Sequence, residues 1–296
     1  MPRRLRVLHL AIALCLSAGA SGCDLLERGG PTTPDPLQPG EIKYTAIGAS
    51  DVNGFGSSAP CFVFLADCEN GTGYVFVAAR TLRAGGSAVT VSSLGIPTAV
   101  ISSRFQSLGA QYGAGTIFGN LIDLEAPSVP SDTTLVTILT GGNDVNVITS
   151  ALGGGAGGSD PTAYLDQQVR NFGEDYATLL NVVRGRAPSA LIVALNLPNL
   201  GAQPKLAGAS LAQKQAAQRA SVRMTTTVVN PLTAQGIRVV DLMCDPRFYL
   251  ASTYSSDGFH PNDAGYAIMA GLVVSAATAP SFAAPAASCP PMTLIP

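Results

Sequence analysis

Short apolar runs that alternate with stretches of helical periodicity are the feature that most constrains how this chain can fold. The apolar runs span residues 44–48, 88–91, 134–139, 190–195 and 237–242. Each is apolar on both faces, which is typical of a strand buried inside a parallel sheet. Helices are expected from Asp160, from about Ser210 until Pro231, and from about Asn262 to Ala279. The alternation predicts an α/β fold of three layers, in which a doubly wound, mostly parallel sheet has helices on both faces.

The N-terminal 40 residues are predicted to lie outside this fold. A cationic start, an apolar run over 7–20 and small residues before Cys23 form the three parts of an export signal. Residues 1–22 are therefore predicted to be a signal peptide. The small residues before Cys23 resemble the bacterial lipoprotein cleavage box, which implies that Cys23 is lipidated and anchors the chain to a membrane of the cell envelope, facing the periplasm or the surface. Ordinary cleavage nearby is the alternative.

Pro-rich residues 23–40 are predicted to be a tether, and residues 41–296 a single domain. Charged residues make up only 12% of the chain and the formal net charge is −2. A nucleic-acid partner is not expected, because the chain lacks the basic composition that phosphates require.

Four cysteines remain after the signal segment and Cys23 are set aside. In an exported protein they predict two disulfides, and the pairs Cys61 with Cys68 and Cys244 with Cys289 are favoured on position. The other two connectivities stay open. Zinc is the competing interpretation, but no histidine lies near any of the four in sequence, so no metal site and no cofactor are predicted.

The mature chain has one imidazole, because His9 leaves with the signal segment and only His260 remains. Asp257, three residues earlier in a glycine-containing turn, is placed to hold Nδ1 of His260 and to leave Nε2 free as a base. A single histidine and four oxidised cysteines disfavour both a histidine-rich metal site and a Cys–His dyad. A serine nucleophile is the remaining option.

Ser50 is the best candidate for this nucleophile, because it follows Gly48-Ala49 at the end of the first predicted strand. Gly95 follows the second strand, and Asn143 follows the third within Gly141-Gly142-Asn143-Asp144. A tetrahedral oxyanion needs two or three hydrogen-bond donors aimed at one point. The backbone N–H groups of Ser50 and Gly95 and the side-chain amide of Asn143 would supply them. Taken alone, each loop is also explained as a helix cap or a turn.

Together these loops resemble the four blocks of the SGNH hydrolases, also called GDSL-type esterases and lipases, with Ser50, Gly95, Asn143 and His260 at the four positions that name the family. The resemblance implies the flavodoxin-like SGNH hydrolase fold and a catalytic triad of Ser50, Asp257 and His260. It also implies an oxyanion hole formed by Ser50, Gly95 and Asn143.

The implied activity is hydrolysis of carboxylic esters through an acyl-enzyme, with short-chain acyl esters or lysophospholipid-like lipids as substrates. A carbohydrate deacetylase of the envelope and a non-catalytic surface lipoprotein are the alternatives. Two positions depart from the family pattern: Ala49 stands where the family usually has Asp, and Asp51 where it usually has Leu. The lost aspartate puts the rigidity of the Ser50 loop in doubt.

Overall fold

The parallel sheet predicted from the apolar runs is present, and all of its strands are parallel. The computed structural model describes residues 35–62 and 68–296, so the predicted signal peptide, Cys23 and most of the tether lie outside the described residues. The sheet has five strands in the order β2-β1-β3-β4-β5. They are β1 (Glu41–Gly48), β2 (Ala88–Ser93), β3 (Leu135–Leu139), β4 (Leu191–Leu195) and β5 (Arg238–Val240).

The second run differs from the prediction that every strand is buried on both faces. Every residue of β3 and β4 is buried, whereas Ala88 and Thr90 of β2 are exposed. Strand β2 lies at an edge of the sheet and its only strand neighbour in the described chain is β1, whereas β5, at the other edge, is buried at all three residues. The run over residues 88–91 did not distinguish an edge strand from a central one.

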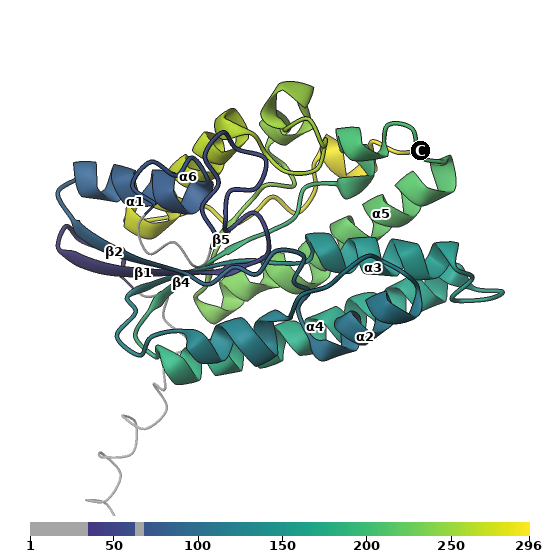
Figure 1. The fold of residues 1–296 in the computed structure, drawn as a ribbon, viewed down its shortest axis with the longest axis horizontal. Helices are drawn as coiled ribbons and strands as arrows, with labels where there is room; N and C mark the ends of the chain where they lie inside the picture. Colours follow the sequence, from purple (N-terminus) through teal and green to yellow (C-terminus); the bar gives the residue numbers. More distant parts are fainter. Residues whose placement is uncertain (1–34, 63–67) are drawn as a thin grey trace, which may run out of the picture. The chain divides into compact units, whose positions relative to one another are not determined.

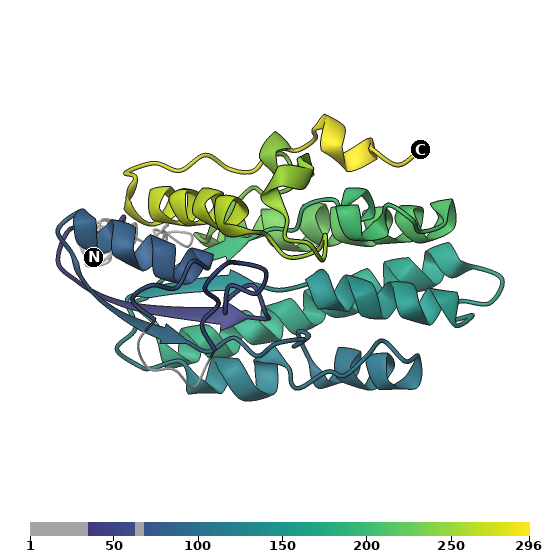
Figure 2. The ribbon, with the colours of Figure 1, turned by 45° about the horizontal axis from the view of Figure 1, so that its top comes forward.

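Six helices of the described chain cover the two faces of the sheet. They are α1 (Tyr74–Ala84), α2 (Ser103–Gln111), α3 (Gly142–Gly153), α4 (Pro161–Arg186), α5 (Leu211–Met224) and α6 (Asp263–Thr278). Figure 1 shows α1 and α6 on one side of the sheet and α2, α3 and α4 on the other, and Figure 2 shows the same layers from a second direction. Helix α5 packs against α3 and α4. This is the predicted three-layer arrangement.

Local signals explain where the predicted helices begin. The side chain of Asp160 accepts a hydrogen bond from Ala163 N at 2.9 Å, and Pro161 occupies the first turn of α4. Ser210 and Gln213 form a capping box at the start of α5. The α-helical hydrogen bonding of α5 ends earlier than predicted, at Met224, and continues as a π-helical turn and a 3₁₀ turn that contains Pro231. Pro231 has no N–H to donate and therefore does not belong to a regular helix.

The carboxyl ends of the strands carry the candidate site residues. Ser50 follows β1, Gly95 follows β2 and Asn143 follows β3. The chain leaves β1 toward β2 on one side and continues from β3 toward β4 and β5 on the other, so the strand order reverses between β1 and β3. Ligands in open α/β sheets bind at such a reversal, and Ser50 and Asn143 lie on its two sides.

Both favoured disulfides are present: Cys61 pairs with Cys68, and Cys244 pairs with Cys289. The second joins the loop after β5 to the C-terminal segment, across 45 positions of sequence.

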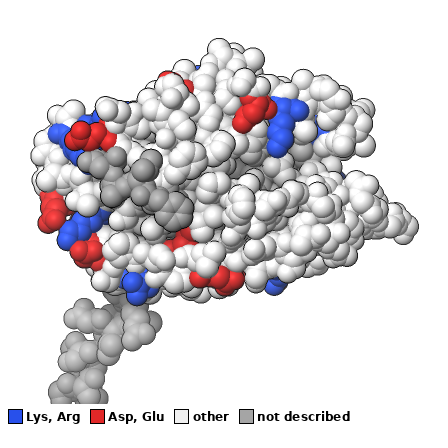
Figure 3. Space-filling view, in the orientation of Figure 1, with Lys and Arg blue, Asp and Glu red and all other residues white. Residues whose placement is uncertain are grey.

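In the residues that the structure describes, no helix is both long enough and apolar enough to cross a membrane. Figure 3 shows the face of the molecule that is turned to the viewer in Figure 1. On the described part of that face charged side chains are few and scattered, with positive and negative ones side by side.

Candidate active site

Ser50, His260 and Asp257 form a hydrogen-bonded row. Ser50 Oγ lies 2.8 Å from His260 Nε2, and His260 Nδ1 lies 2.5 Å from Asp257 Oδ2. The serine is 6% exposed and the histidine side chain 14%, so the hydroxyl is shielded but reachable. This geometry gives the hydroxyl a base within proton-transfer distance and gives the base a carboxylate on its far side.

The turn that carries His260 also holds Asp257 in its ionised form. Asp257 Oδ1 accepts hydrogen bonds from Phe259 N at 2.8 Å, from His260 N at 2.9 Å and from Ser255 Oγ at 2.8 Å. Burial raises the pKa of Asp257, but the bond to His260 and these further donors outweigh it and hold the pKa well below its usual range. The carboxylate is therefore charged at neutral pH.

A glycine allows the sharp turn that presents Ser50. Gly48, the last residue of β1, has a φ of 150°, and a Cβ there would collide with the carbonyl oxygen of Leu139 on β3. Only glycine fits both the conformation and the close approach. Past the turn, Asn53 Nδ2 donates to Gly95 O at 2.8 Å, which ties the Ser50 loop to the loop after β2.

Three N–H groups near Ser50 are free to bind a negative oxygen. Among the hydrogen bonds of the described residues, none is donated by Ser50 N or Gly95 N. Asn143 Nδ2 donates one of its two hydrogens to Ala99 O at 2.9 Å, and the other remains. A Cβ at Gly95 would lie 2.8 Å from Ala49 O and closer still to Val52, so the loop can approach the Ser50 turn only as glycine.

A residue that the sequence analysis missed, Glu125, joins the two loops. Its Oε2 accepts from Gly48 N at 2.6 Å and its Oε1 from Ile96 N at 3.2 Å, and the residue is 1% exposed. Burial raises the pKa of Glu125 to about 8, against the lowering effect of the two backbone hydrogen bonds. The aspartate that the family usually has at the Ala49 position is absent, but a buried carboxyl still ties the Ser50 loop to the Gly95 loop.

Asp144, next to Asn143, anchors the same region from α3. Its Oδ1 accepts from Ile101 N at 2.9 Å, and burial raises the pKa of this fully buried carboxyl to about 7. Together with the bond from Asn143 to Ala99, this contact fixes the loop after β2 against the start of α3. The first turn of α3 thus positions the Asn143 amide.

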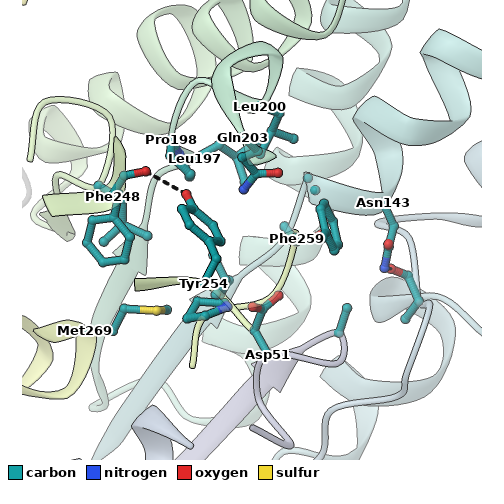
Figure 4. Close-up of a pocket in the computed structure, with 18 residues that line it drawn as sticks. Asp51, Asn143, Leu197, Pro198, Leu200, Gln203, Phe248, Tyr254, Phe259 and Met269 are labelled. Atoms are coloured by element: carbon teal, nitrogen blue, oxygen red, sulfur yellow. Dashed lines mark hydrogen bonds between the residues drawn. The ribbon is translucent and has the colours of Figure 1, made fainter. Parts of the chain in front are cut away.

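A cavity of about 60 Å³ opens beside Ser50, at the carboxyl ends of β3, β4 and β5 (Figure 4). Asn143 and Ala99 lie at its margin, and the side chain of Asp51 points into it. Asp51 is therefore part of the cavity wall. Among the described residues, no group of three or more His, Cys, Asp and Glu side chains is arranged to hold a metal ion.

Comparisons with known proteins concern the sequence family and the fold. Residues 46–268 match the family described as GDSL-like Lipase/Acylhydrolase. An extracellular lipase from Streptomyces rimosus is 17% identical with a TM-score of 0.52, covering 79% of this chain and 99% of the lipase. A lipase from a goat rumen metagenome is also 17% identical, with a TM-score of 0.54 and coverage of 81% and 100%. At these identities the likeness shows the fold. Among curated proteins, none matches the sequence significantly.

Proposed function

The chain belongs to the GDSL-like lipase/acylhydrolase family, and on that premise we propose that it hydrolyses short-chain carboxylic esters with Ser50 as nucleophile. The observation that carries the proposal is the hydrogen-bonded row in which Ser50 Oγ lies 2.8 Å from His260 Nε2 and His260 Nδ1 lies 2.5 Å from Asp257. A hydroxyl, a base and an orienting carboxylate in this order are what acyl transfer to serine requires.

The reaction takes two steps. His260 Nε2 accepts the Ser50 proton while Oγ bonds to the ester carbonyl carbon, and the carbonyl oxygen becomes negative. The N–H groups of Ser50 and Gly95 and the amide of Asn143 stabilise that oxygen. The bond to the alcohol oxygen breaks, and His260 donates the proton to it. Water then attacks the acyl-enzyme by the same route, releases the carboxylic acid and restores Ser50.

Asp257 keeps the Nδ1 proton of His260 in place and stabilises the imidazolium that forms in each step. Its lowered pKa supports this role, since the carboxylate stays charged throughout the neutral range. The cavity of about 60 Å³ favours short acyl chains over the long chains of lysophospholipids. No feature of the cavity favours carbohydrate deacetylation over this reaction.

Release of p-nitrophenol from p-nitrophenyl butyrate tests the proposal. Ser50→Ala and His260→Ala are each expected to abolish turnover, and a fluorophosphonate probe is expected to label wild type but not Ser50→Ala. Ser159→Ala, on an exposed turn, is the matched control and is expected to retain both signals. Turnover above the uncatalysed rate in the Ser50→Ala protein would contradict the assignment, as would equal probe labelling of Ser50→Ala and wild type.

We also propose that the protein is exported and anchored to a membrane through a lipid on Cys23. Support comes from the three-part signal over residues 1–22 and from two disulfides, which persist in oxidising compartments. The expected result is incorporation of labelled palmitate by the wild-type chain and none by Cys23→Ala. The proposed lipid anchor would be contradicted if the Cys23→Ala protein were recovered in the membrane fraction as fully as wild type.

A further inference from the structure

A second carboxyl group, that of Asp51, lies next to the candidate nucleophile and outside its hydrogen-bonded row. Tyr266 Oη lies 3.3 Å from Asp51 Oδ1, but the same hydroxyl donates its single hydrogen to Phe55 O at the shorter distance of 2.7 Å. The backbone N–H of Asp51 itself also donates to this carboxyl, and no other residue of the described chain donates to Oδ2. The carboxyl of Asp51 therefore has acceptor capacity left, and it points into the cavity (Figure 4).

Two further polar groups reach the same space. Gln203 is 7% exposed and lines the cavity opposite Asp51, and its amide is hydrogen-bonded to the hydroxyl of Tyr254 (Figure 4). Thr140 follows β3 and also lines the cavity, and its Oγ1 is buried with no hydrogen-bond partner among the described residues. The rings of Tyr254 and Phe259 lie on either side of the space between Gln203 and Asp51 (Figure 4). A buried hydroxyl without a partner costs stability unless a ligand supplies one.

The size of the cavity and its polar groups restrict what it can hold. Its volume of about 60 Å³ is well below the roughly 150 Å³ that accommodates benzene in an engineered cavity, so only a short chain fits. A hydroxyl on that chain donates to Asp51 and accepts from Thr140, whose Oγ1 has no other partner among the described residues. An ammonium group only donates, and burial raises the pKa of Asp51 and so disfavours the negative charge that a cation needs.

The position of Asn143 decides whether the acyl chain or the alcohol of the ester enters the cavity. The Asn143 amide lies at the margin of the cavity, so a carbonyl oxygen held there places its carbon at the entrance. The leaving oxygen must face His260, which takes no part in lining the cavity. The chain on the acyl side therefore enters the cavity, and the alcohol lies outside it.

We propose that this cavity is the acyl subsite and that it selects a short acyl chain bearing a hydroxyl group, with Asp51 accepting the hydrogen bond from that hydroxyl. This proposal rests on the proposed ester hydrolysis and names its substrate class, esters of short hydroxy acids. Asp51 occupies a position where related proteins usually have Leu, so the selection belongs to this chain's own departure from the family pattern.

The test compares p-nitrophenyl butyrate with the two enantiomers of p-nitrophenyl 3-hydroxybutyrate on the wild-type protein. One hydroxy ester is expected to have a kcat/KM at least about tenfold above that of butyrate, because the analogue without the hydroxyl leaves buried polar groups unpaired. Equal values for all three esters would overturn the acyl selection and leave ester hydrolysis standing. Faster hydrolysis of p-nitrophenyl 3-aminobutyrate than of either hydroxy ester would overturn it in favour of a cationic chain. No turnover of any ester would overturn the proposed function, and the selection with it.

Variants then test whether Asp51 and Thr140 cause the preference for the hydroxy ester. Asp51→Leu is expected to bring the ratio of hydroxy ester to butyrate close to one, whereas Asp51→Asn, which keeps an acceptor oxygen, is expected to retain part of it. Thr140→Val preserves shape, removes the cavity hydroxyl and is expected to lower the ratio. Asp35→Asn, exposed and distant in sequence, is the control for loss of a carboxylate. The proposal would be overturned if the ratio of hydroxy ester to butyrate were unchanged in both Asp51→Leu and Thr140→Val. If Asp51→Leu does not fold, an unchanged ratio in Thr140→Val alone would overturn it.

Discussion

Replacing Glu125 is expected to separate the two loops on which the proposed oxyanion hole depends. Glu125→Ala removes the acceptor of the buried Gly48 N–H and one of the two acceptors of the half-buried Ile96 N–H. Ile96 N keeps a second acceptor, Gly48 O at 3.2 Å, so only Gly48 N is left without a partner. A buried donor without a partner costs about 1–3 kcal/mol, and the variant is expected to lose about that much unfolding free energy. Domains are typically stable by only about 5–15 kcal/mol. Glu125→Gln keeps one acceptor oxygen and is expected to lose about half as much.

The same change is expected to slow turnover, because Gly48 precedes Ser50 by two residues and Ile96 follows Gly95 directly. Misplacing a single oxyanion donor costs up to about 3 kcal/mol of barrier, or about 10²-fold in kcat. Glu125→Gln is therefore expected to lower kcat by about 10- to 100-fold and to leave KM for p-nitrophenyl butyrate within a few-fold of wild type. Such a split identifies a positioning residue, since Glu125 does not line the substrate cavity.

The stability contributed by Glu125 also has a defined pH dependence. Its pKa in the folded protein is about 8, above the ordinary value of 4.5, so the folded state holds this proton more tightly than the unfolded state. As pH rises through the window from about 4.5 to about 8, the unfolded carboxyl is ionised first and the stability of wild type falls. Above that window both states are ionised and this contribution is constant. Glu125→Gln is expected to lack this part of the slope.

Urea unfolding and p-nitrophenyl butyrate kinetics from pH 5 to pH 9 measure both effects. Glu174→Gln, on the exposed face of α4, is the matched control and is expected to change stability by less than about 0.5 kcal/mol. The reasoning is refuted if Glu125→Ala unfolds at the urea concentration of wild type, or if Glu125→Gln keeps full kcat with lowered stability. The second result would mean that the contact supports the fold but not the site.

Three further predictions follow from the site and the disulfides. Asn143→Ala is expected to lower kcat for p-nitrophenyl butyrate about 10²-fold, and a loss confined to KM would contradict its role as an oxyanion donor. Asp257→Asn is expected to lower kcat about 10⁴-fold, the size seen in serine hydrolase triads, and a kcat near that of wild type at pH 7 would argue against an orienting carboxylate. The double variant Cys244→Ala with Cys289→Ala is expected to lose up to about 4 kcal/mol of unfolding free energy in urea, given a separation of 45 positions, and an unchanged midpoint would refute this.

Element type was predictable wherever the local pattern was strong. The apolar runs predicted all five strands, and Asp160 with Pro161 predicted the start of α4. Helices α1, α2 and α3 were not predicted, since they are short or rich in small residues and their burial depends on the layers that they join. The edge position of β2 depends on strand order, which no single run encodes.

Some residues of the candidate site could be predicted from the sequence, and others could not. Ser50, Gly95, Asn143, Asp257 and His260 were named from motifs because each follows a predicted strand or lies in a recognisable turn. Glu125, Gln203 and Thr140 were missed. Their local sequences carry no signal: Glu125 lies two residues from Asp123 in the same segment, and nothing in the chain order distinguishes the buried carboxyl from the solvated one.

By itself, the sequence determined the fold class, the chemistry available and the strand ends at which that chemistry lies. These follow from local periodicity and from the single histidine of residues 23–296, and both are properties of the chain before it folds. Tertiary structure alone decided that Glu125 connects two loops and that Asp51 faces a cavity with Gln203 and Thr140. Such contacts join residues far apart in the chain, and their energies arise only when burial removes water from polar groups that have no local partner.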